Sequence, residues 1–236
     1  MKISIIQPCF VPWLGYFEQI AVADVFVYMD DVQYTKKDWR NTNQLKTQNG
    51  IKRIFVPVKK PSRCTRINEA VISHDEKWQE ILLNKIKAWY KKSLYFKEIM
   101  SLIDPIILSH FEKLVDFNFA LNNALLSYLE ISTPIYFSSQ VPRNTNDKNL
   151  RIIEICNHFN ADILYDGKSA ADFIDTDLFQ RSGIEVYFQN YQHRPYRQLW
   201  GDFVPYMSVL DLLMNEGKRS REIILSSPLP DRMQRA

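Results

Sequence analysis

Cysteine is scarce in this sequence, and the cysteines present are not spaced to pair with one another or to bind zinc. The 236 residues include three, Cys9, Cys64 and Cys156, an odd number at wide spacing. Such spacing is typical neither of a disulfide framework nor of a zinc site. It favours a reducing compartment, so we expect a cytoplasmic protein without a metal site or a cofactor.

Long apolar runs are also missing. No stretch approaches the roughly 18–20 consecutive apolar residues that a helix needs to cross a bilayer, so we expect no membrane span. The N-terminus has one lysine and no cleavage site of small residues, which disfavours a signal peptide. Hydrophobic residues make up 46% and charged residues 24%, an ordinary globular balance that excludes wholesale disorder.

The net charge is small, but its distribution along the chain is uneven. Residues 1–100 carry 17 Lys or Arg and 10 Asp or Glu, whereas residues 101–236 carry 13 and 17. A positive N-terminal part suits a ligand that bears phosphate, such as a nucleotide, a nucleotide sugar or an RNA end. A solvated basic face explains the charge equally well, and both interpretations stay open.

The first thirty residues have the pattern of a βαβ unit. A short apolar run over residues 3–6 predicts a buried strand, the apolar spacing over 16–23 predicts a helix, and residues 25–29 predict a second strand. We expect these strands to be parallel and adjacent or nearly so, with a right-handed crossover. Ligands of open α/β sheets bind beyond the carboxyl ends of the strands, so we expect the site there.

Polar residues follow both predicted strands. Asp30 and Asp31, at the end of the second strand, can accept hydrogen bonds from sugar hydroxyls, bind an amine, or cap the next element. Arg40 lies in a predicted loop over residues 32–50, and its guanidinium can bind two oxygens of a phosphate or carboxylate. The candidate binding residues of this edge are Gln7, Gly15, Tyr16, Tyr34, Arg40, Asn41 and Asn43.

The middle of the chain is predicted to be mostly helical. Asn49-Gly50 predicts a tight turn before a strand at 52–58, and residues 67–72 predict a short strand. The expected helices span 76–89, 94–103 and 105–130, the last beginning at Asp104-Pro105. We interpret residues of about 75–130 as a helical insertion.

The α/β pattern then resumes. Strands are expected at 135–139, 162–165 and 184–188, and helices at 147–159, 171–181 and 208–214. The turn Asp166-Gly167-Lys168-Ser169 follows a strand at the expected ligand edge. It lacks the first glycine of a phosphate-binding P-loop, so we reject that motif.

Several of these residues form a pattern that resembles the WbqC-like protein family. The N-terminal part of the pattern is Gln7-Pro8, Phe10, Pro12-Trp13, Gly15-Tyr16-Phe17, Asp30-Asp31, Tyr34 and Arg40-Asn41-x-Asn43. The C-terminal part is His193, Tyr196, Gln198, Phe203, Ser208, Asp211, Asn215 and Gly217. The resemblance covers nearly the whole chain and implies a single domain over 1–236. The family usually places Pro directly after its C-terminal His, whereas here Arg194 intervenes.

The resemblance implies a transferase of bacterial surface-polysaccharide or O-antigen (lipopolysaccharide) biosynthesis. Its expected substrate is a nucleotide-linked amino sugar, whose amino group receives an acyl or aminoacyl group, with glycyl as the first choice. An aminoacyl-tRNA, a carrier-protein thioester and a coenzyme A ester all remain open as donors. The alternative is a non-catalytic protein that binds a sugar nucleotide within a biosynthetic complex.

A weaker resemblance links the N-terminal unit to nucleotidyltransferases and class I aminoacyl-tRNA synthetases. It implies a Rossmann-like (nucleotidyltransferase/HUP-like), mostly parallel sheet with a helical insertion. Trp13, Gly15 and Tyr16 stand where those enzymes carry His-x-Gly-His. An indole and a phenol cannot stabilise a departing pyrophosphate as imidazolium does, so a degenerate nucleotidyltransferase is a third alternative.

The catalytic candidates are His193, Asp30 and Asp31. A histidine with a pKa of about 6.5 suits the role of general base toward an attacking amine. Cys9 would permit a thioester intermediate, but it is not a family-motif position. The C-terminal binding candidates are Tyr196, Gln198, Ser208 and Asp211, and Ser208 is equally suited to cap a helix. We predict that His193 and Tyr196 share one cleft with the N-terminal candidates.

Overall fold

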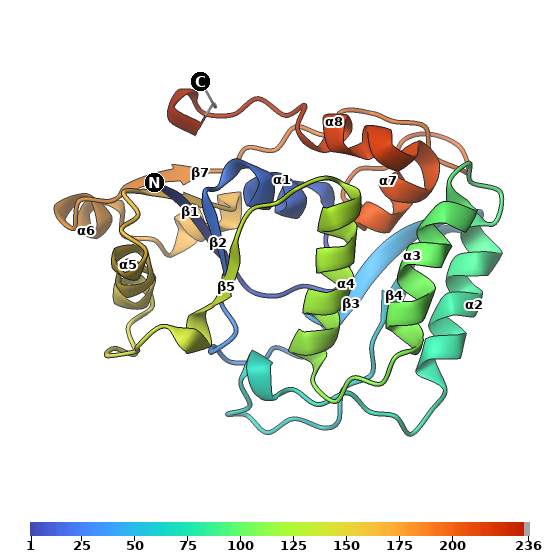
Figure 1. The fold of residues 1–236 in the computed structure, drawn as a ribbon, viewed down its shortest axis with the longest axis horizontal. Coiled ribbons are helices and arrows are strands. Elements are labelled where there is room, and N and C mark those ends of the chain that lie inside the picture. The colour runs from blue at the N-terminus through green and yellow to red at the C-terminus, as the bar shows by residue number, and fades with distance from the viewer. Residues whose placement is uncertain (234–236) are drawn as a thin grey trace.

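Five parallel strands form one sheet in the computed structural model, which describes residues 1–233 (Figure 1). The strands are β1 (Lys2–Ile6), β2 (Val25–Tyr28), β5 (Ile135–Phe137), β6 (Ile163–Asp166) and β7 (Glu185–Phe188). Their spatial order is β5-β2-β1-β6-β7, and every neighbouring pair is parallel. The predicted parallel pairing of the first two strands is confirmed, with Ile3 opposite Val25. This is the strand order of a doubly wound, Rossmann-like sheet.

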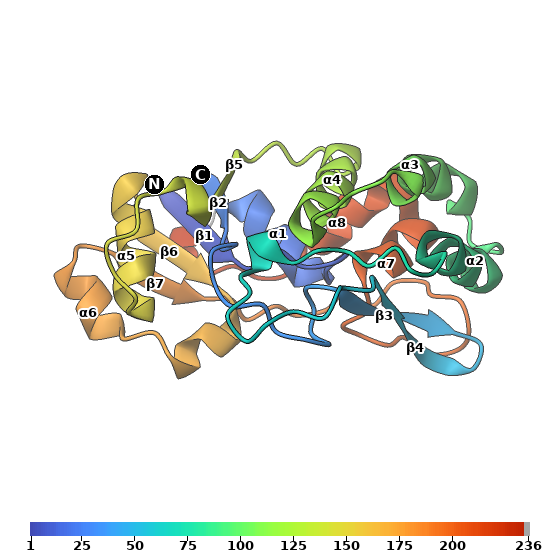
Figure 2. The ribbon, with the colours of Figure 1, turned by 90° about the horizontal axis from the view of Figure 1, so that it is seen from below.

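Helices cover both faces of this sheet (Figure 2). The helices are α1 (Leu14–Val22), α2 (Trp78–Tyr90), α3 (Phe96–Leu108), α4 (Leu114–Tyr128), α5 (Lys148–His158), α6 (Thr176–Arg181), α7 (Val209–Glu216) and α8 (Ser220–Ile224). Successive side chains of a strand point to opposite faces. Ile5 and Val27 accordingly pack with the residues of α5 and α6, whereas Phe26 and Tyr28 pack with those of α1.

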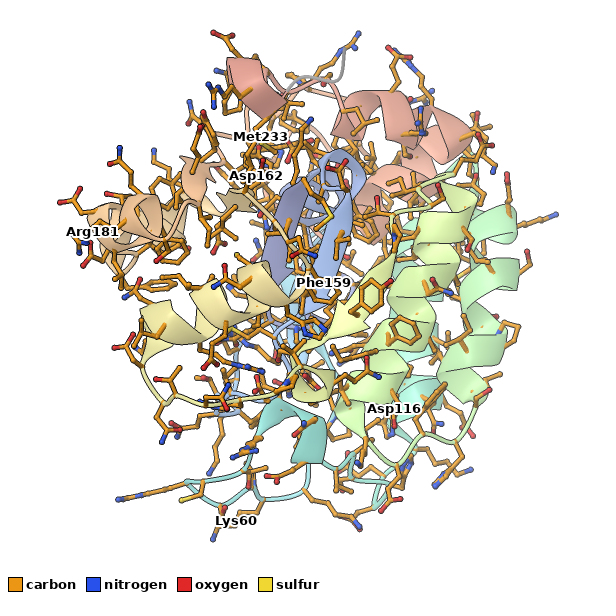
Figure 3. The ribbon with its side chains drawn as sticks, turned by 60° about the vertical axis from the view of Figure 1, so that its left-hand side comes forward. Lys60, Asp116, Phe159, Asp162, Arg181 and Met233 are labelled. Atoms are coloured by element: carbon orange, nitrogen blue, oxygen red, sulfur yellow. The ribbon has the colours of Figure 1, made fainter. Side chains whose placement is uncertain are left out.

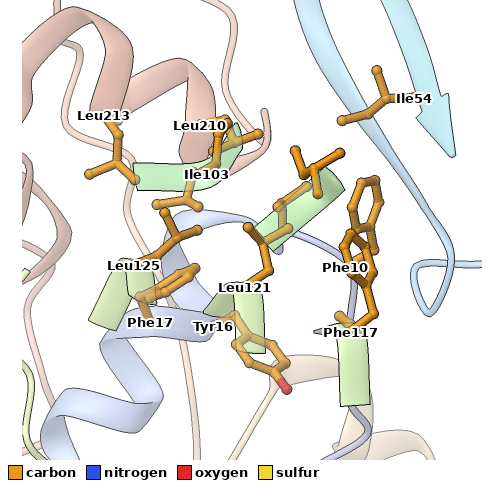
Figure 4. Close-up of a cluster of buried hydrophobic side chains, with 14 of the residues drawn as sticks. Phe10, Tyr16, Phe17, Ile54, Ile103, Phe117, Leu121, Leu125, Leu210 and Leu213 are labelled. Atoms are coloured by element: carbon orange, nitrogen blue, oxygen red, sulfur yellow. The ribbon is translucent and has the colours of Figure 1, made fainter. Parts of the chain in front are cut away.

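A β-hairpin and three helices stand beside the sheet (Figure 1). Strands β3 (Thr42–Thr47) and β4 (Gly50–Phe55) are antiparallel, and Gly50 has a φ of 83° in the turn that Asn49-Gly50 predicted. Helices α2, α3 and α4 fall between β4 and β5 in the chain. One hydrophobic cluster runs from Phe17 of α1 through Leu121 of α4 to Leu213 of α7 (Figure 4). The hairpin and helices therefore share a core with one face of the sheet.

Three segments differ from the prediction. Residues 42–47 were expected in a loop but form β3, whose polar side chains, such as that of Lys46, are buried and hydrogen-bonded. Residues 67–72 were expected as a strand, but a 3₁₀ turn (Ile67–Glu69) occupies their first half. Asp104-Pro105 does not begin a helix, because α3 runs through it to Leu108. Pro105 lies near the end of α3, where its missing N–H removes only one backbone hydrogen bond.

Residues 1 and 233, the first and last that the structure describes, lie near the amino edge of the sheet. Lys2 Nζ donates to the carbonyl of Met233 at 3.2 Å, and the N-terminal amine pairs with Asp162 just before β6. In Figure 3, Asp162 and Met233 lie together at one end of the molecule and Lys60 lies at the other. The carboxyl edge therefore faces the loops that follow β2 and β4. Within residues 1–233, none of the helices has the length and apolar character that a bilayer crossing requires.

Candidate functional site

A cavity of about 940 Å³ opens at the carboxyl edge of the sheet. Gln7 and Gln189 line it directly beyond the ends of β1 and β7, and Asp166 lines it as the last residue of β6. The chain proceeds outward from β1 through β2 to β5 on one side, and from β6 to β7 on the other. The boundary between β1 and β6 is therefore the topological switch point, where open α/β sheets bind ligands.

The cavity walls combine aromatic rings with cationic groups. The aromatic residues are Trp13, Tyr16, Trp39, Phe173, Tyr191 and Tyr206, and the cationic residues are Arg40, Lys148 and Lys168. Aromatic faces provide stacking surfaces for a base or a sugar ring, and cations suit phosphate oxygens. The lining therefore matches a ligand that has rings and negative charge.

Arg40 is held in the cavity wall by two side chains. Its Nη2 donates to Oε1 of Gln7, and its Nη1 donates to Oδ2 of Asp38 at 2.7 Å. The Arg40 Nε is buried and has no hydrogen-bond partner among residues 1–233. The structure thus brings two predicted binding residues, Gln7 and Arg40, into direct contact at the cavity.

Asp166, at the end of β6, is a cavity residue that the sequence analysis did not select. Its Oδ1 accepts a hydrogen bond from Gly167 N at 2.7 Å, and its backbone carbonyl accepts one from Gln189 N at 2.7 Å. Burial raises the pKa of this carboxyl to about 7. The available signal was an acid at the end of a parallel strand, the same signal that selected Asp30. The P-loop pattern is defined by its glycine spacing and does not identify Asp166 as a candidate.

A buried polar cluster lies between α1 and the cavity floor. Gln189 Nε2 donates to Glu18 Oε2 at 2.6 Å and to the carbonyl of Gly15 at 2.8 Å. Tyr165 Oη donates to Glu18 Oε1 at 3.0 Å, and Gln19 Nε2 donates to Gln189 Oε1 at 3.0 Å. Burial raises the pKa of Glu18 to about 7. These bonds fix the orientation of the amides of Gln19 and Gln189, which both line the cavity.

The glycine of the first turn accommodates a neighbouring ring. A Cβ at Gly15 would overlap the indole of Trp13, which itself lines the cavity. The missing side chain therefore makes room for Trp13, and Gly15, a binding candidate from the sequence, does not itself line the cavity. Tyr16 lines the cavity and donates its hydroxyl to the carbonyl of Gln7 at 3.0 Å.

Of the remaining N-terminal candidates, only Asn43 reaches the cavity. Its Nδ2 donates to the carbonyls of Phe10 and Val11, both at 2.9 Å. Val11 has a φ of 35°, so Asn43 secures a strained part of the segment after β1. Asn41 donates to the carbonyl of Val56 at 2.9 Å, and Tyr34 is buried outside the cavity lining.

Asp30 and Asp31 are buried and do not line the cavity. Asp30 accepts hydrogen bonds from Ser139 N at 2.9 Å and Ser139 Oγ at 2.7 Å, which cap the turn after β5. Asp31 Oδ2 lies 3.2 Å from both Arg143 Nη1 and Arg151 Nη2. The Asp30 contacts are the capping alternative that the sequence left open, whereas the ion pairs of Asp31 were not predicted. The catalytic role of both acids stays a prediction.

His193 lies behind the aromatic wall of the cavity. Its ring centroid is 5.5 Å from that of Trp13, 5.0 Å from Tyr191 and 4.3 Å from Tyr206, all three of which line the cavity. Both ring nitrogens are buried without a partner among residues 1–233. Burial lowers the pKa of His193, which favours the neutral imidazole. His193 is thus on the same side of the molecule as Arg40, but aromatic rings separate it from the cavity.

The C-terminal candidates Tyr196, Gln198 and Asp211 form a separate network. The Asp211 carboxylate accepts hydrogen bonds from Tyr90 Oη at 2.6 Å, Tyr196 Oη at 2.7 Å and Gln198 Nε2 at 2.8 Å. Lys46 Nζ donates to Gln198 Oε1 at 3.2 Å. None of these residues lines the cavity. The network instead ties the segment before α7 to the hairpin and to α2.

Two further candidates contact the backbone near the cavity. Ser208 caps α7, where its Oγ accepts from Leu210 N at 3.3 Å and donates to the carbonyl of Val11 at 2.7 Å. Cys9 lines the cavity, and burial raises the pKa of its thiol to about 12. A thiol in that state is a poor nucleophile, which disfavours a thioester intermediate.

Within residues 1–233, no group of three or more His, Cys, Asp or Glu is arranged to hold a metal ion.

Comparison with known proteins gives two matches. The sequence model of the WbqC-like protein family matches residues 7–223, a span that holds every cavity residue except Ile5 and Ile6. A protein of Mycobacterium tuberculosis, described as "Uncharacterized protein Rv1507c", is 36% identical over 226 residues, which are 94% of this chain and 97% of that protein. No solved structure matches the chain.

Proposed function

This chain belongs to the WbqC-like protein family, and from that membership we propose that it is a transferase of polysaccharide biosynthesis. Its proposed substrate is a nucleotide-linked amino sugar, bound in the switch-point cavity. The proposed reaction attaches an acyl or aminoacyl group, glycyl by first choice, to the sugar amino group. The observation that carries this proposal is the cavity itself, which combines rings, cations and a buried carboxyl at the carboxyl edge of a parallel sheet.

The cavity supports a ligand of this size and charge. Ligand pockets of roughly 300–1,000 Å³ are usual for small molecules and cofactors, and this cavity is near the upper end of that range. Arg40, Lys148 and Lys168 provide positive charge for a diphosphate, and Trp39 and Phe173 provide surfaces for stacking. The aromatic rings and amides of the remaining wall suit a sugar.

The acyl transfer requires that the amine and the acyl donor be held together and that a base accept a proton from the amine. The free amine attacks the acyl carbonyl carbon, a C–N bond forms, and the bond from that carbon to the donor oxygen or sulfur breaks. One proton leaves the nitrogen and one proton reaches the departing group. Holding the two reactants together supplies a large part of the rate, and a placed base supplies a further 10²–10⁴-fold, both as general orders of magnitude.

Three finer assignments belong to the same proposal. We place the reaction in the cytoplasm, in O-antigen or related lipopolysaccharide assembly. We group the sheet with the nucleotidyltransferase/HUP-like folds because its strand order fits that class, although its first turn lacks the histidines of those enzymes. We treat residues 1–236 as a single domain with a helical insertion, because one hydrophobic cluster joins α1, α4 and α7.

The test is a transfer assay with defined donors. The protein is incubated with a UDP- or dTDP-linked amino sugar and, separately, with a glycyl-tRNA, a glycyl carrier-protein thioester or glycyl-coenzyme A, and product mass is followed. We expect one donor to give a nucleotide sugar heavier by one acyl group. The N-acetylated sugar nucleotide is the control and should give no product, because its nitrogen is blocked. Tight binding without product from any donor would contradict the transferase and favour a sugar-nucleotide-binding protein.

A further inference from the structure

The proposed transfer needs a proton acceptor inside the cavity, and Asp166 has the position for it. It ends β6, next to the switch point, and lines the cavity together with Gln7 and Gln189. Its backbone is fixed on both sides, because β6 pairs with β1 through Leu164 and Gln189 N donates to its carbonyl at 2.7 Å. A side chain on a strand end is held more rigidly than one in a loop.

Asp166 differs from the other buried carboxylates in its hydrogen bonds. Asp30, Asp31, Asp211 and Glu18 each accept hydrogen bonds from at least two other residues. Asp166 accepts one through Oδ1, from Gly167 N, and its Oδ2 has no donor among residues 1–233. Oδ2 is therefore the carboxylate oxygen of Asp166 that is free to accept a hydrogen bond from a ligand in the cavity.

The charged groups around Asp166 leave its carboxyl without an ion pair. Lys168 follows it in the chain and Lys148 begins α5, and both line the same cavity, but neither forms a salt bridge with Asp166 among the described residues. Cys156 is a titratable residue of α5, and burial, with a smaller contribution from the Asp166 charge, raises the pKa of its thiol. A cationic or hydrogen-bond-donating group of the ligand would complete this environment.

We propose that Asp166 Oδ2 binds the amino group of the nucleotide-linked sugar and takes its proton as that amine attacks the acyl donor. This inference rests on the proposed function, because it concerns the same cavity and the same reaction. The C–N bond forms as the N–H proton passes to Oδ2, and Asp166 then gives that proton to the departing oxygen or sulfur. The carboxylate is thereby regenerated.

The raised pKa of Asp166 suits this role better than the pKa of an ordinary aspartate would. Burial raises the pKa of its carboxyl to about 7, close to a cytoplasmic working pH, where a general base is most effective. His193, the base predicted from sequence, has both nitrogens buried behind Trp13 and Tyr206. The geometry therefore gives the proton-accepting role to Asp166.

The first experiment measures amine recognition without turnover. Calorimetry at pH 7.5 measures the binding of two pairs of sugar nucleotides. One pair is UDP-glucosamine and UDP-glucose, which carry an amine and a hydroxyl at the same position. The other pair is a dTDP-linked 4-amino sugar and its 4-hydroxyl counterpart. Wild type should bind the amino member of one pair about tenfold or more tightly than its hydroxyl counterpart, because the protonated amine pairs its positive charge with the carboxylate. The ammonium releases this first proton to water before the free amine attacks. Asp166→Asn should lose this preference. Asp172→Asn, an exposed aspartate outside the cavity lining, should keep it.

The second experiment measures turnover. Asp166→Asn should lower kcat by about 10²–10⁴-fold, and KM for the amino-sugar nucleotide should rise by about the same factor as the amine preference that the variant loses. Wild-type kcat/KM should rise with pH through about 7 and then level, since the base must be ionised in the free protein. The Asn variant should lose this rise, and Asp166→Glu, which retains a carboxylate, should keep it with a shifted midpoint. Far-UV circular dichroism and a thermal unfolding midpoint verify that each variant is folded.

The outcomes separate this inference from the proposed function. Product formation by Asp166→Asn at the wild-type rate would overturn the inference and leave the transferase intact. An amine preference that depends on Asp166, without product from any donor, would support the amine site and contradict transfer. An amine preference unchanged in Asp166→Asn would overturn the inference whatever the turnover. Absence of binding to wild type by either pair would contradict both.

Discussion

Arg151 Nη2 and Asp31 Oδ2 lie 3.2 Å apart and form a buried ion pair between helix α5 and the end of β2, with side chains 1% and 5% exposed. Arg151 also donates to the carbonyls of Ser138 at 2.6 Å and Val141 at 3.1 Å. The guanidinium thus links α5 to the turn after β5. These polar contacts explain why the charged side chain of Arg151 is tolerated inside a hydrophobic layer.

Removal of the carboxylate charge from this pair should destabilise the fold. Asp31→Asn leaves the buried guanidinium of Arg151 with only Glu154, 3.3 Å from Nη1, as a counter-charge. Loss of one partner of a buried ion pair costs about 3–5 kcal/mol. Urea denaturation at pH 7 measures the free energy of unfolding. The exposed Asp172→Asn serves as the control and should change it by less than about 0.5 kcal/mol. A stable Asp31→Asn protein with abolished turnover would instead favour the catalytic role predicted from sequence.

Glu18 should make stability depend on pH. Its carboxyl has a pKa of about 7 in the folded protein and an ordinary value of 4.5, so the native state binds more protons than the unfolded state between these pH values. Stability should therefore fall as pH rises from 4.5 to 7 and change no further above 7 through this group. In Glu18→Gln the fall across this window should be smaller by roughly 3 kcal/mol. Parallel curves of unfolding free energy against pH for wild type and variant would contradict the raised pKa.

Arg40 should contribute to affinity more than to the chemical step. Arg40→Ala removes a cationic fork from the cavity wall and leaves Gln7 Oε1 without its donor. Loss of a hydrogen bond to a charged group costs about 1.5–3 kcal/mol, so the dissociation constant of a UDP-linked amino sugar should rise about 10–100-fold. Arg63→Ala, an exposed arginine outside the cavity lining, is the matched control. Equal affinities in calorimetry for wild type and Arg40→Ala would remove Arg40 from the binding site.

His193 should tolerate replacement by a residue of similar shape. His193→Phe keeps an aromatic ring against Trp13, Tyr191 and Tyr206 and removes two buried nitrogens that have no partner among residues 1–233. We expect an unchanged or higher thermal midpoint and a kcat within about tenfold of wild type. A fall of about 10²–10⁴-fold in kcat at constant KM would return the general-base role to His193 and contradict its assignment to Asp166.

The N-terminal βαβ unit was predictable because its signals are local. Residues 3–6 and 25–29 are apolar runs of strand length, and the crossover rule fixes their relative direction. Strand β3 was missed because its sequence, Thr-Asn-Gln-Leu-Lys-Thr, has one apolar residue. Its polar groups find buried partners only through distant chain segments, as Lys46 does with Gln198. Hydrophobic periodicity carries no information about such partners.

The location of the site was predictable from the sequence, but the residues that line it were predictable only in part. Gln7 and Arg40 were selected because they follow strands at the carboxyl edge, and both line the cavity. Asp211 was selected by family resemblance, but its carboxylate is occupied by two tyrosines and a glutamine. A polar residue of a family motif has the same appearance in a sequence whether it binds a ligand or a buried neighbour. Asp166 gave the same sequence signal as Asp30, and only the structure showed that it lacks a second hydrogen-bond donor.

Alkylation of Cys9, which lines the cavity, can report whether a ligand occupies the cavity. Only a thiolate reacts readily with alkylating reagents, and a pKa of about 12 keeps the Cys9 thiolate scarce at neutral pH, whereas Cys64 is exposed. Cys64 is therefore modified first and Cys9 slowly, at a rate that a molecule occupying the cavity lowers further. The extent of Cys9 modification, read by peptide mass spectrometry, reports cavity occupancy. Candidate metabolites can thus be screened by the protection of one peptide, before any turnover assay has been set up.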